Sequence, residues 1–151
     1  IPGDDSNDAV VADTYASNLA RAAEKAAPKG VEILIEPINT RDIPGYYLNY
    51  VEDAAALIAG VGAPNLKLQF DIYHRQIMSG DVMMGMAGYL PLISHVQIAS
   101  VPDRHEPASG ELDDIRVMQY LDELGYTGWV GCEYRPKAGT VEGLGWMKKV
   151  K

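Results

Sequence analysis

The stretch VEILIEP at residues 31–37 decides the fold class of this chain. Ile33, Leu34 and Ile35 are consecutive and apolar, which is typical of a strand buried on both faces of a parallel sheet. The stretch turns polar at Glu36, directly after its apolar centre. Three later runs share this pattern and also carry, toward the C-terminal end, a side chain that can ligate a hard metal. The strand-like runs are residues 31–36, 66–71, 95–98 and 129–133, and their polar residues are Glu36, Asp71, Gln97 and Glu133.

Apolar residues at helical spacing predict helices before, between and after these strands. The expected helices begin near Ser6 to Asp8, Tyr50, Asp81, Asp113 or Asp114, and Thr140. Side-chain oxygens of Ser6 to Asp8 and of Thr140 are expected to cap the first and the last of these helices. The alternation predicts an α/β fold with a parallel sheet and right-handed crossovers. Such a sheet is either open and doubly wound or half of an eight-stranded barrel. No G-x-G-x-x-G motif follows a strand, which makes a dinucleotide-binding fold a weak interpretation. Active sites of (β/α)₈ barrels lie at the C-terminal ends of the strands, so the strand-end acids favour the barrel.

Composition narrows the class of protein. The chain has 151 residues, 47% of them hydrophobic, which is enough for one ordinary domain with a core. Its net charge of −8 argues against nucleic-acid binding, which requires a basic face. The single cysteine, Cys132, excludes an internal disulfide and a cysteine zinc cluster, and it reads as a small buried strand residue. No apolar stretch is long enough for a membrane span and no signal peptide is visible, so a cytoplasmic protein without a membrane partner is expected.

The four strand-end residues predict a metal site. Taken singly, each acid has a simpler explanation as a solvated residue at the exposed end of a strand. Three carboxylates that converge on one pocket repel one another, and a bound cation removes that repulsion. The donors are all oxygens, which suits Mg²⁺ or Mn²⁺ better than Zn²⁺.

Two further residues are candidates for binding a substrate. His74 follows Asp71 by three residues and could donate or accept a hydrogen bond there, although it could also be a surface loop histidine. Arg104 lies in the polar loop after the third strand and could bind an anionic or hydroxylated substrate. His105, in the same loop, is expected to have no catalytic role.

Four blocks of the chain resemble the hydroxypyruvate isomerase family of xylose-isomerase-like (β/α)₈ barrels. The blocks are LIEPINTRDIPGYYL, LKLQFDIYHRQ, HVQIASVPDRHEPASGELD and GWVGCEYRPK. The resemblance implies metal ligation by Glu36, Asp71, Gln97 and Glu133, with the two glutamates as the proton-transferring pair. It also implies that His74 and Arg104 contact substrate oxygens. Related ketose epimerases usually have a histidine at the third metal position, so Gln97 favours the hydroxypyruvate-type isomerases.

The resemblance also implies a reaction and a larger barrel. The expected reaction interconverts hydroxypyruvate and tartronate semialdehyde, or a related acid such as 2-oxo-tetronate, through an enediolate. Residues 1–151 would form strands five to eight of the barrel, with the first four strands absent. A half barrel has two unpaired sheet edges, which favour aggregation. We therefore expect either an incomplete copy of a longer protein or two copies that complete each other's barrel.

Three alternatives remain open from the sequence. One is a different sugar enzyme of the same group, such as a ketose 3-epimerase or an inosose dehydratase-like protein. Another is a barrel like endonuclease IV, which would require more histidines than the three present and a basic surface. The last is a binding barrel without turnover, or an inactive fragment.

Overall fold

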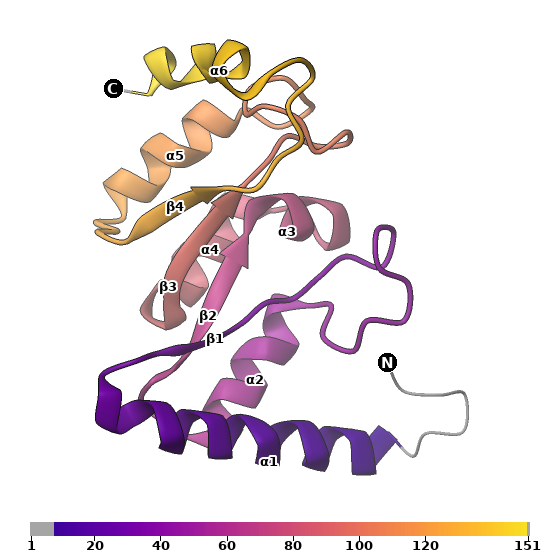
Figure 1. The fold of residues 1–151 in the computed structure, drawn as a ribbon, viewed down its shortest axis with the longest axis vertical. Coiled ribbons are helices and arrows are strands. Elements are labelled where there is room, and N and C mark those ends of the chain that lie inside the picture. The colour runs from indigo at the N-terminus through magenta and orange to yellow at the C-terminus, as the bar shows by residue number, and fades with distance from the viewer. Residues whose placement is uncertain (1–7, 151) are drawn as a thin grey trace.

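The sheet has the predicted parallel topology. The computed structural model describes residues 8–150 and contains a four-stranded parallel sheet in the order β1-β2-β3-β4 (Figure 1). The strands are β1 (Ile33–Ile35), β2 (Leu66–Asp71), β3 (Ile93–Ile98) and β4 (Trp129–Cys132). Within the described residues, β1 pairs only with β2, and β4 pairs only with β3. The strand order follows the chain order, as it does in a β/α barrel.

Helices connect the strands, and most of them lie where the apolar spacing predicts them. The α-helices are α1 (Asp8–Ala26), α2 (Val51–Val61), α3 (Ile72–Met78), α4 (Val82–Tyr89), α5 (Asp114–Glu123) and α6 (Thr140–Gly143). Short 3₁₀ segments are η1 (Ala27–Lys29), η2 (Leu90–Leu92) and η3 (Leu144–Lys149). Ser6, the first expected capping residue of α1, lies outside the described residues. Among residues 8–150 the structure contains no helix that is both long and apolar enough to cross a membrane.

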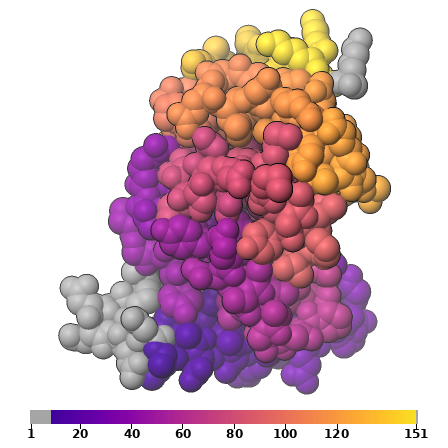
Figure 2. Space-filling view, turned by 180° about the vertical axis from the view of Figure 1, so that it is seen from behind, coloured from indigo at the N-terminus to yellow at the C-terminus, as the bar shows by residue number. Residues whose placement is uncertain are grey.

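The hydrophobic core lies between the sheet and the helices. Leu66, Leu68 and Phe70 of β2 are almost completely buried and belong to one cluster with residues of α1, α2, α4 and α5. The alternate residues of β2, Lys67 and Gln69, are only half-buried because they point to the opposite face of the sheet. Successive parts of the chain lie in order along the long axis of the molecule, from the indigo N-terminal part at one end to the yellow C-terminal part at the other (Figure 2). The sheet therefore has one apolar face that the helices cover and one polar face.

The structure corrects three expectations about local structure. Residues 72–78, which were expected to lead from the second strand into the next helix, form the separate helix α3. Its N-cap is Asp71, whose carboxylate accepts a hydrogen bond from the backbone N–H of Tyr73. The capping residue of α6 is Gly139 rather than Thr140, and no side chain caps that helix. Cys132 is exposed rather than buried, because β4 has only one strand neighbour in the described chain.

Candidate active site

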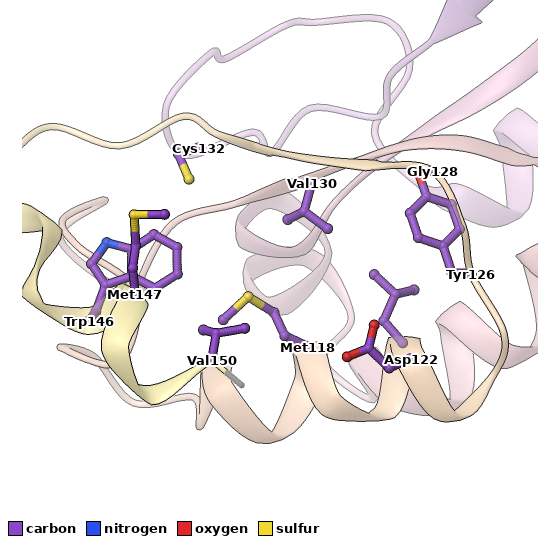
Figure 3. A pocket seen from close by; sticks show the side chains of 10 residues that line it. Met118, Asp122, Tyr126, Gly128, Val130, Cys132, Trp146, Met147 and Val150 are labelled. Atoms are coloured by element: carbon purple, nitrogen blue, oxygen red, sulfur yellow. The ribbon is translucent and has the colours of Figure 1, made fainter.

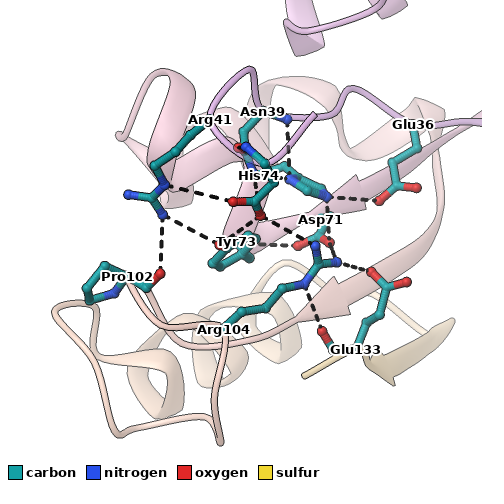
Figure 4. A network of polar contacts seen from close by, with 10 residues as sticks. Glu36, Asn39, Arg41, Asp71, Tyr73, His74, Pro102, Arg104 and Glu133 are labelled. Atoms are coloured by element: carbon teal, nitrogen blue, oxygen red, sulfur yellow. Dashed lines mark hydrogen bonds and ion pairs between the residues drawn. The ribbon is translucent and has the colours of Figure 1, made fainter. Parts of the chain in front are cut away.

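The four predicted strand-end residues lie at the same edge of the sheet. Glu36 directly follows β1, Asp71 is the last residue of β2, and Glu133 directly follows β4. In the register of the sheet, Asp71 pairs with Gln97, and Gln97 pairs with Gly131, two residues before Glu133. Parallel strands that end at one edge bring their terminal side chains together, and Figure 4 shows Glu36, Asp71 and Glu133 around one space.

Carboxylates and an imidazole form a compact cluster at this edge. One potential ligand atom from each of Glu36, Asp71, His74 and Glu133 lies within 4.8 Å of all the others. Oε1 of Glu36 and Oδ2 of Asp71 are buried and have no hydrogen-bond partner. Buried oxygens without a partner are costly, and a cation bound between them would satisfy both. The donor set and the unpaired oxygens therefore fit a divalent metal ion.

The raised pKa values of Glu36 and Asp71 also show that it is costly to ionise both carboxyl groups at this site. Burial, followed by the charges of Asp71 and Glu133, raises the pKa of Glu36 to about 7. Burial also raises the pKa of Asp71 to about 6, although the hydrogen bond from Tyr73 acts in the opposite direction. Both groups resist ionisation because their charges are removed from water and lie close to one another. A bound cation would lower both pKa values, because its positive charge favours the ionised carboxylates.

His74 lies inside the cluster on helix α3, so the alternative of a surface loop histidine is wrong. Its side chain is 4% exposed. Its Nε2 lies 3.8 Å from Oε1 of Glu36 and 3.6 Å from Oδ2 of Asp71, the two unpaired oxygens. Burial, followed by the charge of Arg104, lowers the pKa of His74 to about 4. The imidazole is therefore neutral at physiological pH.

Arg104 connects the loop after β3 to the acidic cluster. Its Nη2 pairs with Oε2 of Glu133 and lies 3.8 Å from Oδ2 of Asp71. Its Nε donates a hydrogen bond of 3.2 Å to the backbone carbonyl of Glu133. The guanidinium also lies over the ring of Tyr73, with Cζ 4.8 Å from the ring centroid. A positive charge is thus held against two of the candidate ligands, where it can attract an anionic substrate.

Gln97 lies on the same face of the sheet, but its amide oxygen already accepts one hydrogen bond. Its Oε1 accepts a hydrogen bond of 2.6 Å from Nε2 of Gln69 on β2. A carboxamide oxygen has two lone pairs, so one remains available for a second partner. His105, in contrast, lies outside the cluster and makes a contact of 2.6 Å between its Nδ1 and the backbone carbonyl of Arg135.

Sequence reasoning missed a polar network that supports the cluster. Asn39 is completely buried and contacts Nδ1 of His74 through its backbone N–H and its side chain. Asp42 accepts hydrogen bonds from Tyr73 and Asn39. Arg41 donates to the hydroxyl of Tyr73 and to the backbone carbonyl of Pro102 (Figure 4). Asn39, Arg41 and Asp42 look like ordinary loop residues in the sequence, since their partners are more than thirty positions away.

An apolar groove lies elsewhere, between β4, α5 and the C-terminal segment. It has a volume of about 330 Å³, and Met118, Val130, Cys132, Trp146 and Val150 contribute to its lining (Figure 3). The acidic residues of the cluster are not among those that line it. Cys132 is exposed and lines this groove, which is separate from the candidate active site.

An acidic cluster at the C-terminal ends of parallel strands is the arrangement found at the active-site end of β/α barrels. Comparison with protein-family models identifies the family. The chain belongs to the xylose isomerase-like TIM barrel family, whose model matches residues 1–150.

Individual relatives agree with the resemblance seen in the four sequence blocks. The chain is 58% identical to 2-oxo-tetronate isomerase of Cupriavidus necator over 89% of this chain and 52% of that protein. It is 43% identical to hydroxypyruvate isomerase of Escherichia coli, over 89% of this chain and 52% of that protein. The chain thus spans about half the length of the curated relatives that it matches. The resemblance to hydroxypyruvate isomerases is confirmed.

A solved structure supports the fold. The crystal structure of an AP endonuclease, family 2, from Brucella melitensis superposes with a TM-score of 0.93 at 43% identity. The match covers 96% of this chain and 56% of that one. The α/β TIM-barrel-like fold predicted from the sequence is therefore confirmed.

Proposed function

We propose that this chain carries the catalytic side of an isomerase that interconverts hydroxypyruvate and tartronate semialdehyde, or a related 2-oxo acid such as 2-oxo-tetronate. The observation that carries the proposal is the convergence of Glu36, Asp71 and Glu133, with two buried carboxylate oxygens unpaired. The names of the two isomerase relatives, at 58% and 43% identity, point to the same reaction class.

We also propose that residues 1–151 are the C-terminal portion of a single (β/α)₈ barrel domain, with β1 to β4 as its strands five to eight. Coverage of about half of each relative supports this assignment. Trp129 supports it too, because this strand residue is 84% exposed. By the alternation of a strand it lies on the same face as Gly131 and Glu133, which further strands of a barrel would enclose.

The proposed reaction moves one proton between adjacent carbons. A carboxylate removes a proton from the hydroxymethyl carbon next to the carbonyl, which gives an enediolate. A carboxylic acid then returns a proton to the former carbonyl carbon, and the hydroxyl proton moves to the other oxygen. Glu36 and Glu133 are the proposed proton-transferring pair. A group that alternates between acid and base must exist in both protonation states near the working pH, and in the metal-free chain the pKa of Glu36 is about 7.

The other residues of the site bind the substrate and a metal ion. Glu36, Asp71, Gln97 and Glu133 are the proposed ligands of Mg²⁺ or Mn²⁺. When bound, the ion would act as a Lewis acid that stabilises the negative charge of the enediolate. Arg104 would bind the substrate carboxylate, which its guanidinium can do with two parallel hydrogen bonds. His74 would donate a hydrogen bond to a substrate oxygen.

A substrate panel tests the reaction class. The protein is assayed with hydroxypyruvate, 2-oxo-tetronate, a neutral ketose and abasic-site DNA, in the presence of Mg²⁺ or Mn²⁺. We expect turnover of at least one of the two acids, because Arg104 provides a cationic partner that a neutral sugar cannot use. Turnover of the ketose alone would replace the proposal with an epimerase. Cleavage of the DNA alone would replace it with a nuclease.

A substitution tests the assignment of Glu133. Glu133→Gln keeps the size of the side chain but removes the charge, so turnover should be lost while the folded structure remains. Glu123→Gln is the matched control, because Glu123 lies on the exposed face of α5 in an ion pair with Arg116. Near-normal turnover by Glu133→Gln would contradict the assignment.

A further inference from the structure

The ring of His74 is held at Nδ1 by two groups of Asn39. The backbone N–H of Asn39 donates to Nδ1 over 3.3 Å, and Nδ2 of the same residue lies 2.6 Å from that nitrogen. A backbone N–H can only donate, so Nδ1 of His74 is an acceptor. The side-chain contact agrees, because Oδ1 of Asn39 already accepts a hydrogen bond of 2.7 Å from the backbone N–H of Asp42. This bond fixes the orientation of the amide and turns its NH₂ group toward the imidazole.

The proton of the neutral imidazole must then be on the other nitrogen. A neutral histidine carries one N–H, and an acceptor at Nδ1 leaves it at Nε2. Nε2 faces the acidic cluster, 3.6 Å from Oδ2 of Asp71 and 3.8 Å from Oε1 of Glu36. Figure 4 shows the ring between Asn39 on one side and the two acids on the other. His74 therefore presents a donor to the space where the substrate is expected.

This arrangement is the opposite of the one that metal-binding histidines use. A histidine ligand binds the metal through an unprotonated nitrogen and donates its other N–H to an acceptor such as a carbonyl or a carboxylate. The other nitrogen of His74 meets two donors and no acceptor. Ligation through Nε2 would move the proton to Nδ1, where it would collide with the N–H groups of Asn39.

We propose that Asn39 is a positioning residue that locks His74 in the Nε2–H form, which makes His74 a hydrogen-bond donor to a substrate oxygen and excludes it from the metal ligands. The role toward the substrate rests on the proposed isomerase function, whereas the tautomer does not. The metal-ligand cluster thus divides into three carboxylates that can bind a cation and one imidazole that cannot.

The surroundings leave Asn39 little freedom to adopt another arrangement. Its side chain is completely buried, and its Nδ2 also lies 3.3 Å from Oδ2 of Asp42. That carboxylate in turn accepts a hydrogen bond of 2.9 Å from the hydroxyl of Tyr73, the residue next to His74. The loop that carries Asn39 and the helix that carries His74 are therefore joined at two adjacent positions.

The test is a two-dimensional ¹⁵N NMR spectrum of the histidine side chains, recorded without substrate at about pH 8, where ordinary imidazoles are neutral. The two tautomers are distinguished by which ring nitrogen carries the proton, and His74→Gln assigns the signals. His105 provides an internal contrast, because its Nδ1 lies 2.6 Å from the carbonyl of Arg135, which can only accept. We expect Nε2–H for His74 and Nδ1–H for His105. Nδ1–H for His74 in the unsubstituted protein would overturn the proposal.

Two additions separate the parts of the proposal. Asn39→Asp replaces the donor with an acceptor and should shift the His74 proton toward Nδ1. Asn65→Asp is the matched control, because Asn65 donates to two backbone carbonyls far from the site and should leave the His74 signals unchanged. Titration with Mg²⁺, which is diamagnetic, should leave the Nε2–H of His74 in place. Loss of that proton on adding Mg²⁺ would overturn the exclusion of His74 from the ligands. Failure of the isomerase assay would leave the tautomer result standing, so the two failures are distinguishable.

Discussion

Gln69 donates a hydrogen bond of 2.6 Å from its Nε2 to Oε1 of Gln97 on the neighbouring strand. In this bond the oxygen end of the Gln97 amide faces Gln69, and one lone pair of that oxygen remains free for a cation. Gln69 lies two positions before Asp71, on the same face of β2. Gln69 can therefore orient the carboxamide of Gln97, which is one of the proposed metal ligands.

Gln69→Ala should weaken metal binding without removing a ligand. Loss of a partner that orients a ligand typically lowers metal affinity by about 10- to 100-fold. Isothermal titration calorimetry with Mn²⁺ measures the change. Gln76→Ala is the control, because the Gln76 side chain donates a hydrogen bond of 3.4 Å to Glu111 and lies outside the proposed ligand set. Equal affinities for the two variants would show that Gln97 needs no support from Gln69.

Metal affinity should rise with pH. The pKa of Asp71 is about 6 and that of Glu36 is about 7, so protons compete with the metal below neutral pH. We expect the affinity to increase as the pH rises through 6 to 7 and to level off above this window. Calorimetry in two buffers with different heats of protonation should detect proton release at the lower pH. Affinity that does not change across the window would contradict the role of these carboxyl groups as ligands.

The metal-free protein should respond to pH in the opposite sense. The pKa of Glu36 is raised from 4.5 to about 7 by folding, so the folded state holds a proton that the unfolded state has already released. The free energy of unfolding should therefore fall as the pH rises from 4.5 to about 7. Urea unfolding at several pH values measures this slope, and Glu36→Gln should make it shallower. An identical slope in the variant would mean that Glu36 titrates normally in the folded chain.

Helix α5 depends on the capping carboxylate of Asp113, which accepts a hydrogen bond of 3.0 Å from the backbone N–H of Arg116. Asp113→Ala removes this cap and should lower the free energy of unfolding by about 1 kcal/mol. Asp122→Ala, on the exposed face of the same helix, controls for the loss of one negative charge. Equal destabilisation of the two variants would show that the hydrogen bond of Asp113 does not stabilise α5.

Periodicity and topology were sufficient to predict the parallel sheet and the edge at which the four candidate residues lie. The common position of Glu36, Asp71, Gln97 and Glu133 could be predicted because parallel strands place their last side chains at one shared edge, wherever the chain goes next. The helix α3 was missed because it has only seven residues and starts directly at its cap, Asp71, with no loop before it. As a result, the sequence left open a surface loop position for His74, which lies buried in α3.

Contacts between distant segments could not be predicted from one sequence. The bond between Asn39 and His74 spans 35 positions, and the one between Tyr73 and Asp42 spans 31. Nothing local marks either residue of the loop as a partner of α3. The prediction that Cys132 is buried was wrong for a related reason. Burial of a residue on β4 depends on what packs against that strand, which a local pattern does not show.

The most direct test of the central claim is the initial rate of hydroxypyruvate isomerisation by protein stripped of metal, before and after addition of Mg²⁺ or Mn²⁺. The same measurement is made with 2-oxo-tetronate and with Glu133→Gln. We predict negligible turnover without metal, recovery on adding it, and no recovery in the variant. Full turnover of both acids by the stripped protein, or recovery in the Glu133→Gln variant, would contradict a metal-assisted proton transfer at this cluster.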